Sequence, residues 1–514
     1  MSSQLYPSPL PDLDIPTVPL TGFVLNKAAS QPDALAMVNA DTGESFTFAQ
    51  LSAAIHELAG GLQQRGFGKG SVLALIAPNS PQYAIVFHAV AVCGGTVTTV
   101  NPLYVADEIR HQLQDSGASL AVTVPACIEN TRQAVQNTDV TDIYSIGSVE
   151  GYTSIDELKG NPIEQVDVDV HQDVVVMPYS SGTTGLPKGV MLSHHNLVAN
   201  LLQVNAAAQN NQSDIALAVL PFFHIYGMQV LMGAMLVEGA TVVTMARFDM
   251  DAVLGAIQHH KVTQFYAVPP IVLGLAKHPA VDNYDLSSLR KVFSGAAPLG
   301  GEVANEAAQR LNCAVVQGYG MTEMSPVSHC TVGYDAKDGS CGVTVPNTLS
   351  RIVNTEGQDQ PTGEVGELWV KGPQVMLGYL NNPTASRETL DADGWLHTGD
   401  VAYIDSDGHM FIVDRVKELI KFKGFQVAPA ELEALLVTHP AVTDAAVIGV
   451  ADYEAGEVPK AFVTVREGSD ATTEEIRQFI NERVTSYKQI RHLEFIDKIP
   501  KSASGKILRR QLRT

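Results

Sequence analysis

The chain has 514 residues, of which 45% are hydrophobic and 17% charged, and its formal charge is −22. This balance excludes a disordered, collagenous or coiled-coil chain. At about 150 residues per domain, a chain of this length predicts three or four domains. The acidic excess argues against a nucleic-acid surface and against adsorption to an anionic membrane.

Cysteine usage and the first residues bear on the compartment. The five cysteines are scattered, odd in number and without a C-x-x-C pair. This pattern is typical of a reducing cytoplasm and excludes a disulfide framework or a zinc site. The opening MSSQLYPSPLPDLDIP lacks the basic and apolar regions of a signal peptide. The apolar stretch 83–100 is interrupted by His88 and two glycines, so we expect a buried helix followed by a strand in a soluble, cytoplasmic protein.

The predicted elements alternate along most of the chain. The Pro-rich opening, up to about Pro19, predicts an extended arm. From residue 46 onward, a helix at 48–66 is followed by apolar strands at 71–77 and 120–124. The same alternation recurs between 170 and 330. Helix–strand alternation at this spacing predicts an α/β fold with parallel sheets.

The last third of the chain has a different pattern. Residues 340–413 are rich in strands and turn signals, and the final hundred residues predict a compact α+β unit with helices at 429–440 and 472–484. Residues 1–400 hold 17 Lys and Arg against 38 Asp and Glu, whereas residues 401–514 hold 16 against 17. The cations gathered at this end indicate either an ordinary solvated face or a module that meets an anionic ligand.

The segment 179–189, YSSGTTGLPKG, is the most informative. It places two Ser, two Thr and three Gly around Lys188, between two apolar strands. Hydroxyls and accessible backbone N–H groups cradle phosphate oxygens, and the lysine adds a mobile point charge. A flexible Gly/Ser linker would not lie directly between two strands. A Walker A loop continues directly into a helix, whereas Gly189 and a strand follow this lysine, so the loop predicts a phosphate site of another kind.

The string SSGTTGLPKGV resembles the phosphate loop of the adenylate-forming superfamily, which includes acyl-CoA synthetases, aryl-CoA ligases, luciferases and nonribosomal adenylation domains. Four further superfamily motifs occur in order: QGYGMTE at 317–323, HTGD at 397–400, VDRVKE at 413–418 and SASGK at 502–506. The resemblance covers essentially the whole chain. The segments PFFHIYGM, SGAAPLG and VDRVKELIKFKGFQVAPAELE look most like 4-coumarate–CoA ligases and their bacterial cinnamate–CoA ligase relatives.

The resemblance implies a fold and a reaction. Residues 1–413 would form a large N-terminal domain of stacked α/β layers with a β-rich part, 414–417 a hinge, and 418–514 a small mobile α+β domain. An acid and ATP with Mg²⁺ would give acyl-AMP and pyrophosphate, and the thiol of CoA would then displace AMP. Because the substrate carboxylate is the first nucleophile, no Ser or Cys nucleophile is required.

The resemblance also assigns nucleotide contacts. Asp400 would accept the ribose hydroxyls, with Arg415 as a second ribose contact, and residues 317–319 would hold the adenine ring. Thr322 would approach the α-phosphate, and Glu323 would offer a carboxylate to Mg²⁺, although an exposed charge at a helix start would look the same. The implied ATP and AMP set is Ser180, Ser181, Gly182, Thr183, Thr184, Lys188, Gln317, Gly318, Tyr319, Thr322, Asp400, Arg415, Lys417, Lys421 and Lys506.

The C-terminal lysines divide by position. Lys421 and Lys423 face the same way if the chain is extended there, and a solvated strand edge would show the same pattern. By resemblance, Lys417 lies at the hinge, Lys421 contacts the adenylate, and Lys423 with Gly424 flanks the CoA channel. Lys506 on its mobile loop would stabilise the charge that builds up during adenylation. The implied catalytic residues are Lys506, Lys421, His224 and Thr322.

The acyl pocket is implied by two other segments. A lone His among aromatics is more often a packed core residue, but by resemblance His224 gates the pocket and Tyr226 lines it. Arg247 would add a second cation for CoA, or is a plain surface arginine. The implied acyl set is His224, Tyr226, Ser294, Gly295, Ala296, Ala297, Gly318, Gly320, Pro326 and Val327.

The resemblance implies 4-coumarate or a related cinnamate as the acid. The sequence MSPVSH, where plant enzymes have an AGPV-type continuation, keeps a medium-chain fatty acid or another aryl acid as the alternative. The expected partners are the acid, ATP, CoA and Mg²⁺, with no nucleic acid and no membrane, in a monomer or homodimer. Rival classes are an adenylating enzyme with oxygen or a carrier-protein thiol as acceptor, and a non-catalytic nucleotide sensor. The chain ends directly after the SASGK motif, which favours a free-standing CoA ligase.

Overall fold

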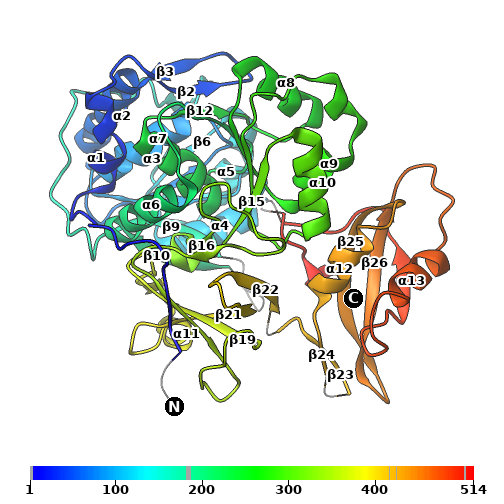
Figure 1. Ribbon diagram of the computed structural model, residues 1–514. Helices are drawn as coiled ribbons and strands as arrows, with labels where there is room; N and C mark the ends of the chain where they lie inside the picture. The colour runs from blue at the N-terminus through cyan, green and yellow to red at the C-terminus, as the bar shows by residue number, and fades with distance from the viewer. Residues whose placement is uncertain (1–3, 181–186, 416, 424, 503–504, 514) are drawn as a thin grey trace.

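The computed structural model describes residues 4–180, 187–415, 417–423, 425–502 and 505–513 (Figure 1). Two large sheets carry most of the N-terminal part, and their central strands are parallel. The first sheet has the order β20 (Gly378–Tyr379), β10 (Lys188–Ser193), β9 (Val174–Ser180), β5 (Thr96–Thr99), β4 (Val72–Ile76), β6 (Leu120–Thr123), β7 (Asp142–Ser145) and β8 (Thr153–Ser154). The second has the order β17 (Val343–Thr344), β16 (Val327–Cys330), β15 (Ala314–Gly320), β14 (Lys291–Ser294), β13 (Gln264–Ala267), β11 (Ile215–Ala218), β12 (Thr241–Thr244), β2 (Leu35–Asn39) and β3 (Ser45–Thr47). The predicted α/β class with parallel sheets is confirmed.

The helices that pack on these sheets begin where the sequence supplies caps. Thr47 and Ser193 each form a capping box at the start of α2 and α6. The helices of the N-terminal part are α1 (Leu20–Val24), α2 (Phe48–Gln64), α3 (Pro81–Val92), α4 (Ala106–Ser116), α5 (Ile128–Ala134), α6 (His194–Ala208), α7 (Ala234–Glu238), α8 (Met250–His260), α9 (Pro269–Lys277), α10 (Gly301–Leu311) and α11 (Pro383–Thr389).

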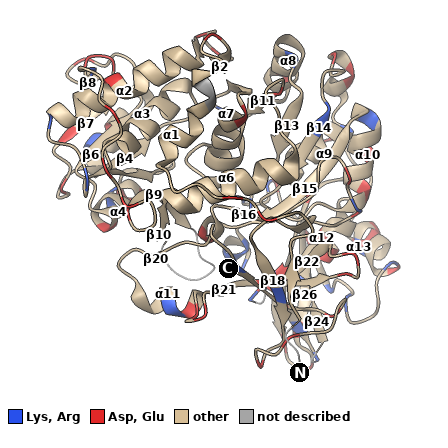
Figure 2. Cartoon of the chain, turned by 60° about the vertical axis from the view of Figure 1, so that its left-hand side comes forward, with Lys and Arg blue, Asp and Glu red and all other residues tan. Residues whose placement is uncertain are grey.

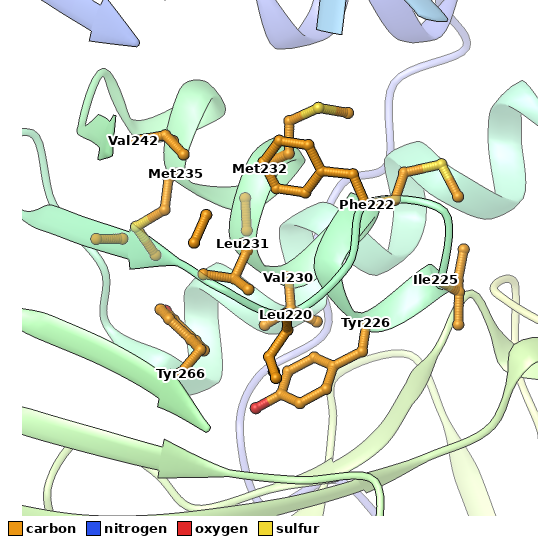
Figure 3. Packing of buried hydrophobic residues seen from close by; sticks show 14 of the residues in the cluster. Leu220, Phe222, Ile225, Tyr226, Val230, Leu231, Met232, Met235, Val242 and Tyr266 are labelled. Atoms are coloured by element: carbon orange, nitrogen blue, oxygen red, sulfur yellow. The ribbon is translucent and has the colours of Figure 1, made fainter. Parts of the chain in front are cut away.

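Two of these helices are central to the core. Neither α3 nor α6 contains Asp, Glu, Lys or Arg, and both are buried along almost their whole length, which requires packing on every side. Figure 2 shows the charged residues on loops and outer helices, away from these two elements. Apolar side chains around the π-helical segment Tyr226–Gly233 continue this core, as Figure 3 shows. Among the described helices, none combines the length and the apolar character that crossing a bilayer demands.

A third, antiparallel sheet forms the β-rich part. Its order is β1 (Tyr6–Pro7), β18 (Leu349–Val353), β19 (Gly366–Lys371), β21 (Leu396–Ile404) and β22 (Met410–Arg415). The predicted N-terminal arm lies on this sheet, because Tyr6 pairs with Ser350 and the Leu13 N–H donates to Asn347 Oδ1 at 2.9 Å.

The C-terminal module, residues 418–513, has its own sheet. The order is β24 (Phe425–Val427), β23 (Ile420–Phe422), β26 (Gly456–Val465) and β25 (Val442–Asp452), and β27 (His492–Phe495) pairs with β26. Helices α12 (Pro429–Leu436) and α13 (Thr473–Asn481) pack on it around a separate hydrophobic cluster. In Figure 1 this module, orange to red, places α12 below α10. A Cβ added at Gly300 would lie 3.5 Å from that of Ala434, so the two parts are in contact.

Candidate active site

A cavity of about 420 Å³ lies between the two parts of the chain. Its walls are the loop after β14, the end of β15, the paired strands β21 and β22, helix α12 and the segment 505–511. The carboxyl ends of parallel strands are where open α/β sheets bind ligands. Residues predicted for the nucleotide and acyl sites that line it are Ala296, Ala297, Gly318, Tyr319, Gly320, Asp400, Arg415 and Lys506.

The two residues predicted to contact the ribose are brought together by strand pairing. Asp400 in β21 lies opposite Arg415 in β22, so the antiparallel register brings together two residues fifteen positions apart. The Arg415 Nε lies 3.1 Å from Asp400 Oδ1, and the Tyr319 hydroxyl donates to Asp400 Oδ2 at 2.6 Å. Burial, and then Asp400, raise the pKa of Tyr319, so the phenol stays protonated as the donor. The predicted ribose and adenine residues therefore share one hydrogen-bonded cluster.

The segment predicted to bind phosphate connects the antiparallel strands β9 and β10 in the sequence. Ser180 pairs with Lys188 at the end of this hairpin next to the connecting segment, and Ser180 is half-buried. The Lys188 Nζ lies 4.1 Å from the centre of the Tyr379 ring, a cation–π contact that fixes where its charge stands. The predicted loop residues Ser181, Gly182, Thr183 and Thr184 lie outside the described residues.

Tyr379 also contacts the carboxylate predicted to hold Mg²⁺. Its hydroxyl donates to Glu323 Oε1 at 2.8 Å, and Glu323 is 3% exposed. Magnesium binds through one or two carboxylates together with substrate phosphates, so Glu323 beside the phosphate loop fits this ion. In the described part of the chain no group of three or more His, Cys, Asp or Glu could hold a metal by itself.

Lys506, from the C-terminal module, adds a positive charge beside Arg415, Asp400 and Glu323. Burial lowers the pKa of Lys506, and Arg415 lowers it further, while Asp400 and Glu323 oppose the effect. Burial and Lys506 together lower the pKa of His224 to about 3, so this imidazole is neutral at neutral pH. The Tyr226 N–H donates to His224 Nδ1 at 3.3 Å, which leaves the ring proton on Nε2.

The predicted acyl residues pack on one another behind this cluster. The Tyr226 hydroxyl donates to the Phe293 carbonyl at 3.2 Å. A Cβ added at Gly295 would lie 3.1 Å from the Tyr226 ring, and one added at Gly320 would lie 2.1 Å from the Pro326 carbonyl oxygen. Gly320 is therefore required by the close approach of the backbone, whereas Gly295 is tightly packed against the tyrosine ring.

Further polar side chains lie near the loop after β14. The Gln317 side-chain amide pairs with the Leu299 main chain in both directions at 3.3 Å, which fixes the loop after β14. Ser294 Oγ is buried and has no hydrogen-bond partner among the described residues. Thr322 and Val327 are buried beside them, at 7% and 5% exposed.

The remaining predicted cations lie elsewhere, and none of the described residues among them lines the cavity. Lys417 and Lys421 are exposed, and the Lys421 N–H donates to Glu457 at 2.8 Å. Lys423 has a φ of 47°, so the chain turns there, and the extended backbone that would make Lys421 and Lys423 face the same way ends at Phe422. Arg247 is exposed after β12. Gly424 lies outside the described residues.

Sequence reasoning missed several residues of the site. Tyr379 gave no signal of its own, because its contacts come from β20 pairing beside β10. Asp414, Glu433 and Arg509 also line the cavity. Glu433 lies in α12, PAELEALL, two residues from Glu431, and the sequence pattern does not distinguish the carboxylate that faces the cavity from the exposed one.

Comparison with known proteins agrees with this geometry. The family model described as AMP-binding enzyme matches residues 24–380, and that described as AMP-binding enzyme C-terminal domain matches residues 431–506. The chain therefore belongs to the AMP-binding enzyme family, as its motifs predicted.

Among curated relatives, 4-coumarate–CoA ligase 5 of Oryza sativa subsp. japonica is 43% identical over 99% of this chain and 97% of its own. 4-Coumarate–CoA ligase 2 of Petroselinum crispum is 42% identical over 99% of this chain and 96% of its own. Among solved structures, the anthranilate CoA ligase AuaEII in complex with anthranoyl-AMP matches with a TM-score of 0.90 at 27% identity, covering 97% of both chains.

Proposed function

We propose that this chain is an AMP-forming acid–CoA ligase that activates a cinnamate-like acid, with 4-coumarate as the leading candidate. The observation that carries the proposal is the convergence of Lys506 with the Asp400–Arg415 pair in one cavity. The full-length likeness to curated 4-coumarate–CoA ligases at 41–43% identity supports the same activity.

In the first half-reaction the acid carboxylate attacks the α-phosphate of ATP, forming acyl-AMP and releasing pyrophosphate. Asp400 accepts the ribose hydroxyls, while the loop before Lys188 holds the phosphates. Mg²⁺, held by Glu323 and phosphate oxygens, would neutralise phosphate charge. Lys506 and Thr322 stand where the charge develops at the α-phosphate, and such a preorganised contact is stronger in a water-excluded site.

The neutral His224 suits a role beside the substrate carboxylate. An imidazole with its proton on Nε2 donates a hydrogen bond without adding a second full charge next to Lys506. Tyr226, the loop 294–297, and the residues Gly318, Gly320, Pro326 and Val327 would shape the space for the acyl group.

In the second half-reaction the CoA thiol attacks the acyl carbon and AMP leaves. We propose that the C-terminal module turns about residues 414–417, so that Lys421, Lys423 and Gly424 replace Lys506 at the site. Arg247 would add a cation for the CoA phosphates.

An acid panel tests the function and the substrate class. Pyrophosphate, AMP and CoA thioester are measured for 4-coumarate, cinnamate, caffeate and medium-chain fatty acids, with and without CoA. We expect CoA-dependent thioester formation from the aryl-propenoic acids. Thioester from medium-chain acids alone would overturn the substrate class. Pyrophosphate release without thioester would indicate another acceptor, and no release with any acid would contradict the ligase.

A further inference from the structure

The loop that carries Lys506 is closed by its own main chain. The Leu508 N–H donates to the Pro500 carbonyl, and the Ser502 N–H donates to the Lys506 carbonyl, both at 2.8 Å. The Lys506 N–H donates in turn to Ser502 Oγ at 3.1 Å. The backbone of Lys506 is therefore held at a constant place on a short stem formed by residues 500–502 and 506–508.

Ion pairs anchor both sides of this stem to the C-terminal module. After the loop, Arg509 Nη2 binds both oxygens of Glu433 at 2.8 Å, and its Nε donates to the Val447 carbonyl at 3.2 Å. Before the loop, Lys501 Nζ lies 2.6 Å from Asp444 Oδ2. The Arg509 and Glu433 side chains are only 14% and 13% exposed, so solvent screens this pair weakly.

The position of Lys506 needs such an anchor. Lys506 is half-buried and lines a cavity where Arg415 presents a like charge, which opposes the lysine's entry as a cation, while Asp400 and Glu323 favour it. Contacts outside the reacting cluster add to the energy that holds the loop there. The ion pair of Arg509 begins three residues after Lys506 and ends on helix α12, which forms a wall of the same cavity.

We propose that Arg509 and Glu433 are positioning residues that clamp the Lys506 loop onto α12 and thereby serve the adenylation half-reaction of the proposed ligase. Neither side chain needs to touch ATP or the acid. The clamp fixes the distance between α12 and Lys506, and when α12 packs under α10 the lysine reaches its place. A misplacement of about 1 Å at a reacting group can cost 10²-fold in rate.

The clamp can be opened without leaving a bare charge inside the protein. Burial raises the pKa of Glu433 to about 7, against the lowering effect of Arg509. Removal of the arginine therefore lets the carboxyl take up a proton, and the guanidinium that remains in Glu433→Gln still has Asp414 as a counter-charge. We expect both variants to fold.

The test compares the two half-reactions in Glu433→Gln and Arg509→Gln. We expect the kcat of ATP–pyrophosphate exchange to fall by about 10–10²-fold with the KM for ATP little changed, while thioester formation from preformed acyl-AMP stays near wild type. Arg509→Lys keeps the charge but loses the second donor, Nε, which bonds the Val447 carbonyl, so its exchange rate should be intermediate. Equal losses in both half-reactions, or no loss of exchange, would overturn the proposal.

Glu431→Gln is the matched control. Glu431 lies in the same helix, two residues from Glu433, and pairs with Lys488 at 2.7 Å on the exposed side. We expect its exchange rate to equal that of the wild type. Amide hydrogen exchange of segment 500–508 gives a second readout that needs no substrate: it should quicken in Glu433→Gln and not in Glu431→Gln. Unchanged protection would overturn the clamp even if the wild type showed no ligase activity, whereas that inactivity would overturn only the proposed function.

Discussion

Lys506 enters from the C-terminal module a cavity that Asp400 and Arg415 line from the N-terminal part, and the charge of Glu323 also acts on it. Without nucleotide, burial and Arg415 lower the pKa of Lys506. A phosphate group brought between the two cations would reverse that effect, since opposite charge at short range favours the protonated form. A bound phosphate therefore favours the charged form of this lysine.

Removal of the Lys506 charge should affect the two half-reactions differently. We expect Lys506→Ala to lower adenylation by about 10²–10³-fold, the effect of losing one preorganised contact, and to spare thioester formation from preformed acyl-AMP. ATP–pyrophosphate exchange and thioester formation are measured separately. Lys498→Ala, at an exposed site on the approach to the same loop, is the control. A parallel loss in both half-reactions would contradict the assignment.

At the scale of elements, the hairpin of β23 and β24 lies away from the cavity. Lys421 pairs across it with Gln426, and both are exposed. A side chain at that place cannot act at the cavity in this orientation of the module. If Lys421 serves the reaction, it serves the other orientation.

We therefore expect Lys421→Ala to leave ATP–pyrophosphate exchange near wild type and to slow thioester formation from preformed acyl-AMP. The loss of one charge contact should lower the rate of thioester formation by about 10²-fold. Lys460→Ala, on neighbouring strand β26, is the control because Lys460 pairs with Glu494 at 2.9 Å. A fall in exchange together with thioester formation would show that Lys421 acts in adenylation.

The elements also show how far sequence reasoning reached. Apolar runs between turn signals predicted the strands, and the Asp400–Arg415 contact follows once two antiparallel strands are recognised. Tyr379 and Glu323 are 56 residues apart in the sequence, and their contact depends instead on how β20 adds to the edge of the first sheet. The Arg509–Glu433 pair spans 76 residues and depends on how the last segment folds back on α12. The local pattern of hydrophobic and polar residues does not predict contacts between residues so far apart in the sequence.

At the scale of the whole molecule, buried histidines link stability to pH. Burial lowers the pKa of His88, His224 and His329 from 6.5 to about 3, and that of His194 to about 4. All four belong to the N-terminal part, and His88 is tied to α1 through Thr21 Oγ1 at 3.1 Å. Each is neutral when folded and becomes protonated on unfolding below about pH 6.5.

These histidines make the folded protein less stable in acid. Between the folded and unfolded pKa values the unfolded chain binds more protons, so the free energy of unfolding falls as the pH falls from 6.5 toward 4. Each histidine contributes a slope of about 1.4 kcal/mol per pH unit in that window and nothing above it. We expect urea unfolding midpoints to be flat from pH 8 to 7 and to drop steeply below 6.5. His88→Gln should reduce the slope by one histidine's share, whereas His492→Gln, at an exposed site, should leave it unchanged. Midpoints that stay level or rise on acidification to pH 5 would contradict this origin of the acid sensitivity.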